Sequence, residues 1–187
     1  SIETGGRAPE AFLAACAVQV RGMLKQFVSC NVVGVGLTVP GMVSYDRRRI
    51  VSALDLGWED VSIEAAAREL PWPLILENDA NAVALAELYF GESPWQEGLV
   101  SVVLNDSLGS GIIAEGRLFR GANGHAGEVG HMLIDPAGEP CTCGRRGCLG
   151  MYASGHGAVQ RYKIAHLRQT RRENPVQPVR VLASETV

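Results

Sequence analysis

Hydrophobic residues recur at helical spacing near the start of the chain. After Pro9, a residue suited to the first turn of a helix, apolar side chains return every three or four positions as far as residue 27. The members of this stripe are Phe12, Leu13, Cys16, Val20, Met23, Leu24 and Phe27. The spacing predicts an amphipathic helix that packs one face against a core.

Strand-like runs follow this helix. Residues 31–37 are mostly apolar and lead to a Pro-Gly turn at 40–41, which predicts a buried strand. A short helix is expected around residues 62–70, and prolines then bound a second strand over residues 74–77.

A further helix is expected to begin at Asn78 and Asp79 and to end at Gly91. Its predicted apolar face carries Ala80, Val83, Ala84 and Leu88. Strands and helices alternate up to this point, an order typical of α/β layering.

The pattern changes near Ser93 and Pro94, where we place a boundary between two lobes. The segments expected after it are a buried strand over 99–104, a hairpin over 111–120 that turns at Glu115 and Gly116, a glycine-rich loop over 121–130, and a strand over 131–135.

Composition narrows the class of protein. The chain has 187 residues, of which 47% are hydrophobic and 20% charged, so it has enough apolar content to fold and is not a disordered segment. Lys and Arg number 17 against 20 Asp and Glu, a net charge of -3, which excludes a chain that grips nucleic acid over its whole surface. No apolar run reaches the roughly 18 residues of a membrane span, and no leader opens the chain, so we expect a cytoplasmic protein without a membrane partner.

Three cysteines and a histidine form the most specific chemical pattern. His131 is followed by Cys141, Cys143 and Cys148, four side chains that match the tetrahedral ligand set of a zinc ion. Pairs of disulfides or plain reduced thiols are the alternatives, but three clustered cysteines do not pair evenly and the cytoplasm disfavours disulfides. Since protein would fill all four positions, we expect a structural rather than a hydrolytic Zn²⁺.

The turn that delivers these thiolates requires flexible backbone, which Gly144 and Gly147 supply. The two remaining cysteines, Cys16 and Cys30, are expected to pack in the core.

Two carboxylates are candidates for contact with a ligand. Asp79 lies at a strand-to-helix junction, where the helix N-terminus would keep it ionised and able to accept a proton from a hydroxyl. The alternative is that Asp79 only caps the helix. Glu128 precedes the candidate ligand His131 by three residues and either lines the same pocket or lies on the surface of the loop.

Other polar segments carry weaker signals. Residues 105–111 contain glycines that suit a phosphate, but Asp106 places negative charge where phosphate oxygens would bind. A basic run over residues 161–172 predicts a solvated helix face rather than a DNA contact.

Several motifs together resemble the ROK family of sugar kinases and sugar-responsive repressors, in order and at fitting spacing over roughly residues 30 to 160. The motifs are Val-Gly-Val-Gly at 33–36 with Pro-Gly at 40–41, Leu-Gly-Trp at 56–58, Glu-Asn-Asp-Ala-Asn at 77–81, Gly-Glu-Val-Gly-His at 127–131, and the Cys-x-Cys-Gly-x-x-Gly-Cys-Leu run at 141–149.

The resemblance implies an α/β, two-lobed fold of the actin, Hsp70 and hexokinase type (ribonuclease H-like), present here in part. Residues 1–93 would be the end of the first lobe, and 94–187 the start of the second lobe with its zinc-binding loop. A small sugar or sugar phosphate would bind between the lobes.

The resemblance also implies roles for particular residues. In kinases of the family, the residues that correspond to Asn78, Asp79, Glu128 and His131 contact the sugar. There Asp79 would be the catalytic base that activates a sugar hydroxyl for attack on ATP, with Mg²⁺. The structural zinc, through its histidine, would shape the sugar pocket.

This chain departs from the kinase pattern at three places. The kinases open with Asp-x-Gly-Gly-Thr, whereas this chain has Thr-Gly-Gly-Arg at 4–7. Their second phosphate loop reads roughly Gly-Thr-Gly-x-Gly-Gly-Gly, whereas residues 105–111 read Asn-Asp-Ser-Leu-Gly-Ser-Gly. Gly150 replaces a glutamate that contacts sugar in the family.

The two phosphate-loop departures resemble the repressor branch more than the kinase branch, so we expect the sugar-sensing effector region of a transcriptional regulator. DNA would be bound only through a helix-turn-helix module that this chain lacks, and the chain is expected to be a fragment of a longer, self-associating protein. An ATP-dependent sugar kinase with Asp79 as base is the alternative, and an inactive remnant is a third possibility.

Overall fold

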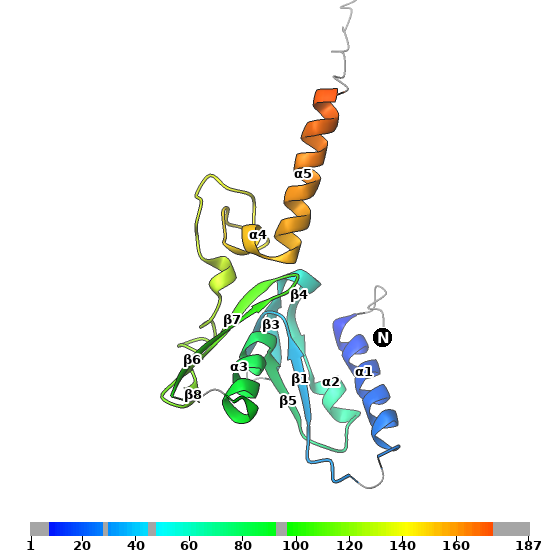
Figure 1. Ribbon diagram of the computed structural model, residues 1–187. Helices are drawn as coiled ribbons and strands as arrows, with labels where there is room; N and C mark the ends of the chain where they lie inside the picture. The colour runs from blue at the N-terminus through cyan, green and yellow to red at the C-terminus, as the bar shows by residue number, and fades with distance from the viewer. Residues whose placement is uncertain (1–7, 28–29, 45–47, 93–96, 174–187) are drawn as a thin grey trace, which may run out of the picture.

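The computed structural model describes residues 8–27, 30–44, 48–92 and 97–173, with side chains of the last helix described as far as residue 166. The strands of this part of the chain form a two-stranded and two three-stranded sheets. Helix α3 lies between the sheets of the two halves, and a long helix projects beyond them (Figure 1).

The first half places a helix over strands, as the apolar pattern predicts. Its elements are α1 (Pro9–Leu24), β1 (Val35–Val39), β2 (Met42–Ser44), β3 (Arg49–Ala53), a 3-10 turn (Leu54–Leu56), β4 (Trp58–Ser62), α2 (Glu64–Arg68) and β5 (Leu74–Asn78). Strands β1 and β5 are parallel, and β2, β3 and β4 form an antiparallel meander.

A single apolar cluster holds these elements together. Leu13 and Ala17 of α1 pack with the meander, in which Ile50 is completely buried, and with Ile63 just beyond it. Phe12 meets Trp58 edge to face, with ring centroids 5.9 Å apart. The predicted helix and the helix near 62–70 are confirmed, but the meander over 42–62 was not predicted, because its mixed polar and apolar positions have no clear period.

The strand predicted over residues 31–37 begins later, at Val35. Its partner β5 begins at Leu74, directly after Pro73, and the Val35 N–H donates to the Pro73 carbonyl at 2.9 Å. Proline has no N–H to extend the ladder further back, so pairing starts there.

The second half consists of α3 (Asp79–Phe90), β6 (Gly98–Leu104), β7 (Leu108–Ala114) and β8 (Arg117–Leu118). The predicted end of α3 at Gly91 is confirmed, and so is the turn at Glu115 and Gly116, which have φ of 52° and 69°. The predicted lobe boundary at Ser93 and Pro94 lies outside the described residues and stays a prediction.

The interpretation of β6 as a buried strand is wrong for one of its faces. Its residues alternate between half-buried and exposed, and Val100 and Val102 are 59% and 62% exposed. Only the opposite face packs against α3, so the strand has the period of a sheet covered on one side.

A 3-10 turn (Val129–His131) then leads into the loop that carries Cys141, Cys143 and Cys148, the cysteine loop. Helices α4 (Gly150–Ala153) and α5 (Gly155–Glu173) follow this loop. The strand predicted over 131–135 is wrong. Only an isolated bridge joins Leu133 to Cys148, because the segment folds back on the cysteine turn instead of entering a sheet.

Two smaller expectations have mixed outcomes. Cys30 is exposed rather than packed in the core, and Cys16 is half-buried. In the basic run, Arg161 and Lys163 are exposed on α5, as expected for a solvated face, while the arginines from residue 168 onward lie beyond the described side chains.

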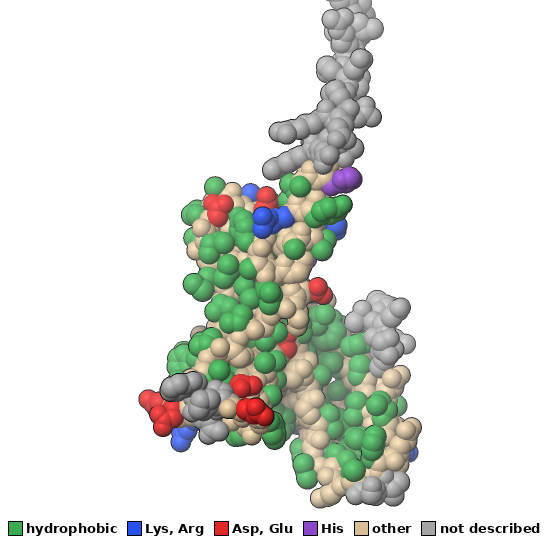
Figure 2. Space-filling view, in the orientation of Figure 1, with side chains coloured by type: hydrophobic (Ala, Val, Ile, Leu, Met, Phe, Trp, Pro, Cys, Tyr) green, Lys and Arg blue, Asp and Glu red, His purple; other side chains and the backbone are tan. Residues whose placement is uncertain are grey.

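Figure 2 shows hydrophobic side chains spread over α1 and over the region of the cysteine loop. Exposed apolar residues in these regions include Met23 of α1 and Met132, Leu133 and Ile134 of the loop. Among the described residues, no helix is long and apolar enough to cross a bilayer.

Helix α3 lies unusually close to β7. A Cβ added at Gly111 would be 2.5 Å from both the Ala80 carbonyl oxygen and the Ala84 Cβ, and one added at Gly109 would be 3.2 Å from the Ala80 Cβ. Gly109 and Gly111 therefore allow α3 to pack closely against the sheet. Both are residues of β7 and not part of an open loop.

We predict that Gly111→Ala destabilises the fold by about 1–3 kcal/mol, because the added methyl group meets backbone that does not yield cheaply. Gly98→Ala in the same sheet is the matched control, since a Cβ there meets nothing within 4 Å. Urea unfolding of both variants measures the difference, and equal stabilities would contradict the close α3–β7 contact.

Candidate functional site

A cavity of about 530 Å³ opens where the two halves meet, within the size range of small-molecule sites. Its walls come from the β1–β2 turn, the β5–α3 junction, the β6–β7 turn, the 127–131 loop and the cysteine loop. The structure thus brings together all four residues predicted to contact a ligand: Asn78, Asp79, Glu128 and His131.

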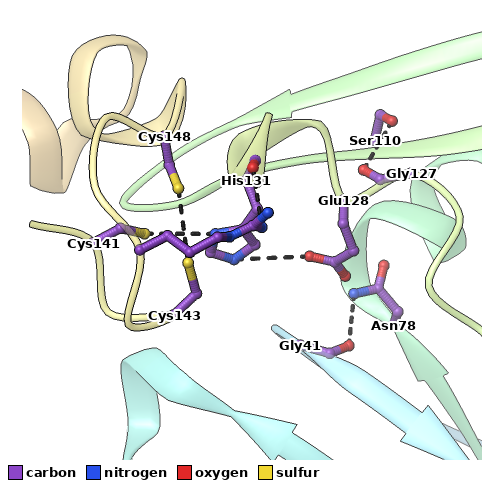
Figure 3. A network of polar contacts seen from close by, with 10 residues as sticks. Gly41, Asn78, Ser110, Gly127, Glu128, His131, Cys141, Cys143 and Cys148 are labelled. Carbon is purple, nitrogen blue, oxygen red and sulfur yellow. Dashed lines mark hydrogen bonds and ion pairs between the residues drawn. The ribbon is translucent and has the colours of Figure 1, made fainter. Parts of the chain in front are cut away.

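Asn78 organises the wall that belongs to the first half. Its Oδ1 accepts from the Asn81 N–H at 2.9 Å, and its Nδ2 donates to the Gly41 carbonyl at 2.9 Å (Figure 3). Asn78 is therefore the N-cap of α3, and the interpretation of Asp79 as the cap is wrong.

Asp79 is the first residue of α3 and is half-buried at the cavity wall. Its Oδ1 accepts from the Ala80 N–H at 2.9 Å, and the helix N-terminus favours its negative charge. A carboxylate held in this way can accept a hydrogen bond, or a proton, from a hydroxyl group in the cavity.

Glu128 faces the cavity from the second half. The pKa of its carboxyl group is raised, mainly by burial and further by Asp79, while His131 and His125 offset only part of the shift. Asp79 and Glu128 both line the cavity, so their negative charges border the same space. Glu128 is half-buried and lines the pocket, a position that favours the first of the two interpretations.

The 127–131 loop is held in place by β7. The Ser110 N–H and Oγ both donate to the Gly127 carbonyl, at 2.9 and 3.0 Å. Gly127 has a φ of 91°, and its Cα lies so close to the Ser110 backbone that no Cβ fits. Glycine is required at this position, and its fixed conformation directs Glu128 toward the cavity.

His131 lies between the cavity and the cysteine group. Its Nδ1 is 3.5 Å from the Cys141 Sγ, while its Nε2 is 3.9 Å from the Glu128 Oε2 (Figure 3). One ring nitrogen thus faces the candidate metal position and the other faces the carboxylate that lines the pocket. A carboxylate on the second nitrogen is the usual support for a metal-binding histidine.

The predicted metal ligands converge. The ligand atoms of His131, Cys141, Cys143 and Cys148 all lie within 4.8 Å of one another, and the Cys143 and Cys148 sulfurs are 3.7 Å apart. Three sulfurs and one imidazole at this separation fit a closed tetrahedral zinc site. These four side chains would hold the ion, which would crosslink the loop and leave no open position for chemistry.

The cysteine turn depends on both predicted glycines. Gly144 and Gly147 have φ of 85° and 67°. At Gly147 a Cβ would also collide with the Asp135 backbone, and the Gly147 carbonyl accepts from the Ile134 N–H at 2.9 Å. The turn is thereby anchored to the segment that follows His131.

The pKa values of Cys143 and Cys148 are shifted in opposite directions. Burial opposes ionisation of Cys143, but hydrogen bonds from Arg145 and from the other two cysteines outweigh it and lower its pKa to about 6. Burial and the neighbouring sulfurs raise the pKa of Cys148 to about 12. A bound zinc ion would replace this arrangement by holding all three as thiolates.

Some polar residues at or beside the site were not predicted. His125 and His156 line the cavity, and Glu77, which accepts from the Asn78 N–H, forms an ion pair with Arg120. A histidine within the glycine-rich loop is a signal for His125, but no local pattern links Glu77 to Arg120.

Sequence and structure comparisons agree with this architecture. The structure has the actin/hexokinase type of α/β fold, present in part, with a cavity between its halves and a cysteine-histidine loop beside it. A sequence profile of the ROK family matches residues 6–185, and the chain belongs to that family.

Its relatives include both enzymes and regulators. It is 37% identical over 132 residues to the glucokinase of Halalkalibacterium halodurans, a match that covers 70% of this chain and 40% of that protein. It is also 37% identical over 125 residues to the xylose repressor of Bacillus subtilis, covering 66% of this chain and 32% of that protein. The chain thus spans less than half the length of these relatives.

Among solved structures, it is similar to a ROK family glucokinase from Streptomyces griseus in complex with glucose and AMPPNP. The TM-score is 0.73 at 30% sequence identity, over 90% of this chain and 52% of that one.

We predict that the purified protein contains about one zinc ion per chain and that Cys148→Ser removes it, because the fourth ligand completes the tetrahedral site. Cys30→Ser, at an exposed cysteine outside the loop, is the control and should retain the metal. Elemental analysis by mass spectrometry measures the content, and a metal-free wild type would contradict the prediction.

Proposed function

We propose that this chain is the sugar-binding effector region of a ROK transcriptional regulator, with the cysteine loop held by structural zinc. A sugar in the cavity would contact Asn78 and Asp79 on one wall and Glu128 and His131 on the other. Binding would favour one arrangement of the two lobes and so change the DNA affinity of an attached module.

The β6–β7 turn is the feature that favours a regulator over a kinase. The carbonyls of Asn105 and Asp106 accept from the Gly155 and His156 N–H groups at 2.8 and 3.0 Å. The next N–H, of Gly157, donates to the Ser154 Oγ at 3.0 Å. The amides at the start of α5, which would otherwise suit a phosphate, are thus already used.

The charge of this wall argues in the same direction. Asp106 belongs to the β6–β7 turn and lines the cavity, so its carboxylate would repel the phosphates of a nucleotide. A glycine-rich hairpin with free amides would attract them instead. Asp106 in the turn is therefore better suited to a site that binds a sugar without a phosphate donor.

The same charge argument indicates which class of sugar the cavity would bind. Among the described residues, Asp79, Asp106 and Glu128 line the cavity together with a single arginine, Arg145, and this excess of carboxylates favours a neutral sugar over a sugar phosphate. The xylose repressor of Bacillus subtilis, with 37% identity, supports a regulator of this kind. A cytoplasmic, self-associating protein that binds DNA through a separate module completes the proposal.

A sugar kinase is the second candidate, and Asp79 is the observation that favours it. Its carboxylate lies at the cavity wall, where it could act as the base for a sugar hydroxyl, with ATP and Mg²⁺ as co-reactants. The similarity to two glucokinases also supports this candidate.

We predict that the full-length protein binds D-xylose or D-glucose, and that Asp79→Asn and Glu128→Gln each weaken binding by about 1–3 kcal/mol through a lost hydrogen-bond acceptor. Glu59→Gln, on the exposed surface of β4, is the control. Titration calorimetry with these sugars and with glucose 6-phosphate checks both the site and the preference for neutral sugars. Tighter binding of the phosphate would contradict that preference.

We further predict no sugar-dependent release of ADP from ATP by the full-length protein. A coupled assay measures this rate, and Asp79→Asn serves as the reference. Turnover in the wild type that disappears in Asp79→Asn would replace the regulator with the kinase.

A further inference from the structure

We propose that Glu77 and Arg120 are a positioning pair that fixes the two walls of the cavity relative to each other without touching the bound sugar. The inference rests on the proposed function, because it assigns these residues a part in sugar affinity. It concerns an ion pair between positions 43 residues apart, one on each half of the fold.

Glu77 lies at the end of β5 and is only 8% exposed. One carboxylate oxygen, Oε1, accepts from the Asn78 N–H at 3.0 Å and from the Asn81 Nδ2 at 3.2 Å. The other, Oε2, is 2.5 Å from an Arg120 guanidinium nitrogen. The carboxylate therefore holds the backbone and the first turn of the helix that present Asn78 and Asp79 to the cavity.

Arg120 lies just beyond β8, at the start of the loop that carries the opposite wall. Its carbonyl accepts from the Ala126 N–H at 3.1 Å, which closes residues 121–126 into a compact loop. Gly127 and Glu128 follow immediately. The side chain of Arg120 thus reaches the Asn78 wall while its backbone fixes the base of the Glu128 loop.

The ion pair adds a tie at the place where the two halves would rotate. Helix α3 begins directly after β5 but packs mainly on β6 and β7, so the β5–α3 junction joins the two halves. A rotation at this junction changes the distance between Glu77 and Arg120. A charged hydrogen bond there favours one separation of the walls, and preorganisation of this kind raises affinity for a ligand that contacts both.

A merely structural pair would behave differently. Loss of Arg120 would leave the buried Glu77 carboxylate without its cationic partner and so destabilise the fold, whatever the pair does for the cavity. A positioning pair also lowers the affinity of the folded protein for sugar, because the walls are no longer held at the separation that the sugar needs. Affinity measured on fully folded protein separates the two roles.

The test compares Arg120→Met, Arg120→Lys and Arg117→Met in the full-length protein. Arg117 is an exposed arginine three positions earlier, on β8 itself, and provides the control. Calorimetry with D-glucose and D-xylose measures affinity below the unfolding transition of every variant. Hydrogen exchange in the absence of sugar measures backbone protection at residues 78–81 and 121–128.

We expect Arg120→Met to weaken binding of the sugar that the wild type prefers by about 10- to 100-fold, a loss of the size seen when an outer partner of a metal ligand is removed. Arg120→Lys, which keeps the charge, should recover part of the affinity, and Arg117→Met should match the wild type. Without sugar, Arg120→Met should increase exchange on both walls.

Unchanged affinity in Arg120→Met, or faster exchange confined to residues 121–128, would overturn the inference. A wild type that binds neither sugar would instead count against the proposed function. In that case the sugar-free exchange data alone decide whether the pair couples the two walls.

Discussion

The contact between α3 and β7 joins the two halves of the fold and so shapes the cavity between them. Because Gly111 has no side chain, the helix backbone lies directly against the strand, with Ala80 and Ala84 at the contact. This contact brings the start of α3 toward the loop that follows β8. Asp79, at the β5–α3 junction, and Glu128, in the loop that follows β8, consequently line one cavity.

The cysteine loop is a second constraint, and it acts on the same cavity through a single side chain. His131 presents one ring nitrogen to the thiols and the other to Glu128. A zinc ion held by this loop would therefore fix the orientation of the imidazole and, through it, one wall of the pocket. Metal binding and ligand binding are thus expected to be linked even though the closed ligand set leaves the metal without a reactive position.

Much of the architecture was predictable because its signals are local. The periodicity after Pro9, the proline before β5 and the Glu115-Gly116 turn each specify structure within a few residues. The predictions that failed share one cause, because each outcome depends on contacts with residues distant along the chain. The segment after His131 has the composition of a strand, but it pairs with the cysteine turn and not with a sheet, and Cys30 is apolar but lies where no core reaches it.

The identity and spacing of neighbouring residues were enough to predict the candidate ligands of the cysteine loop, the residue types of the candidate pocket and the family. Only the tertiary structure decided that Asn78 rather than Asp79 caps α3, that Gly109 and Gly111 admit a helix, and that Glu77 meets Arg120. Each of these outcomes depends on contacts between residues distant along the chain or on the exact backbone course at a junction. Such contacts leave no local pattern from which to predict them.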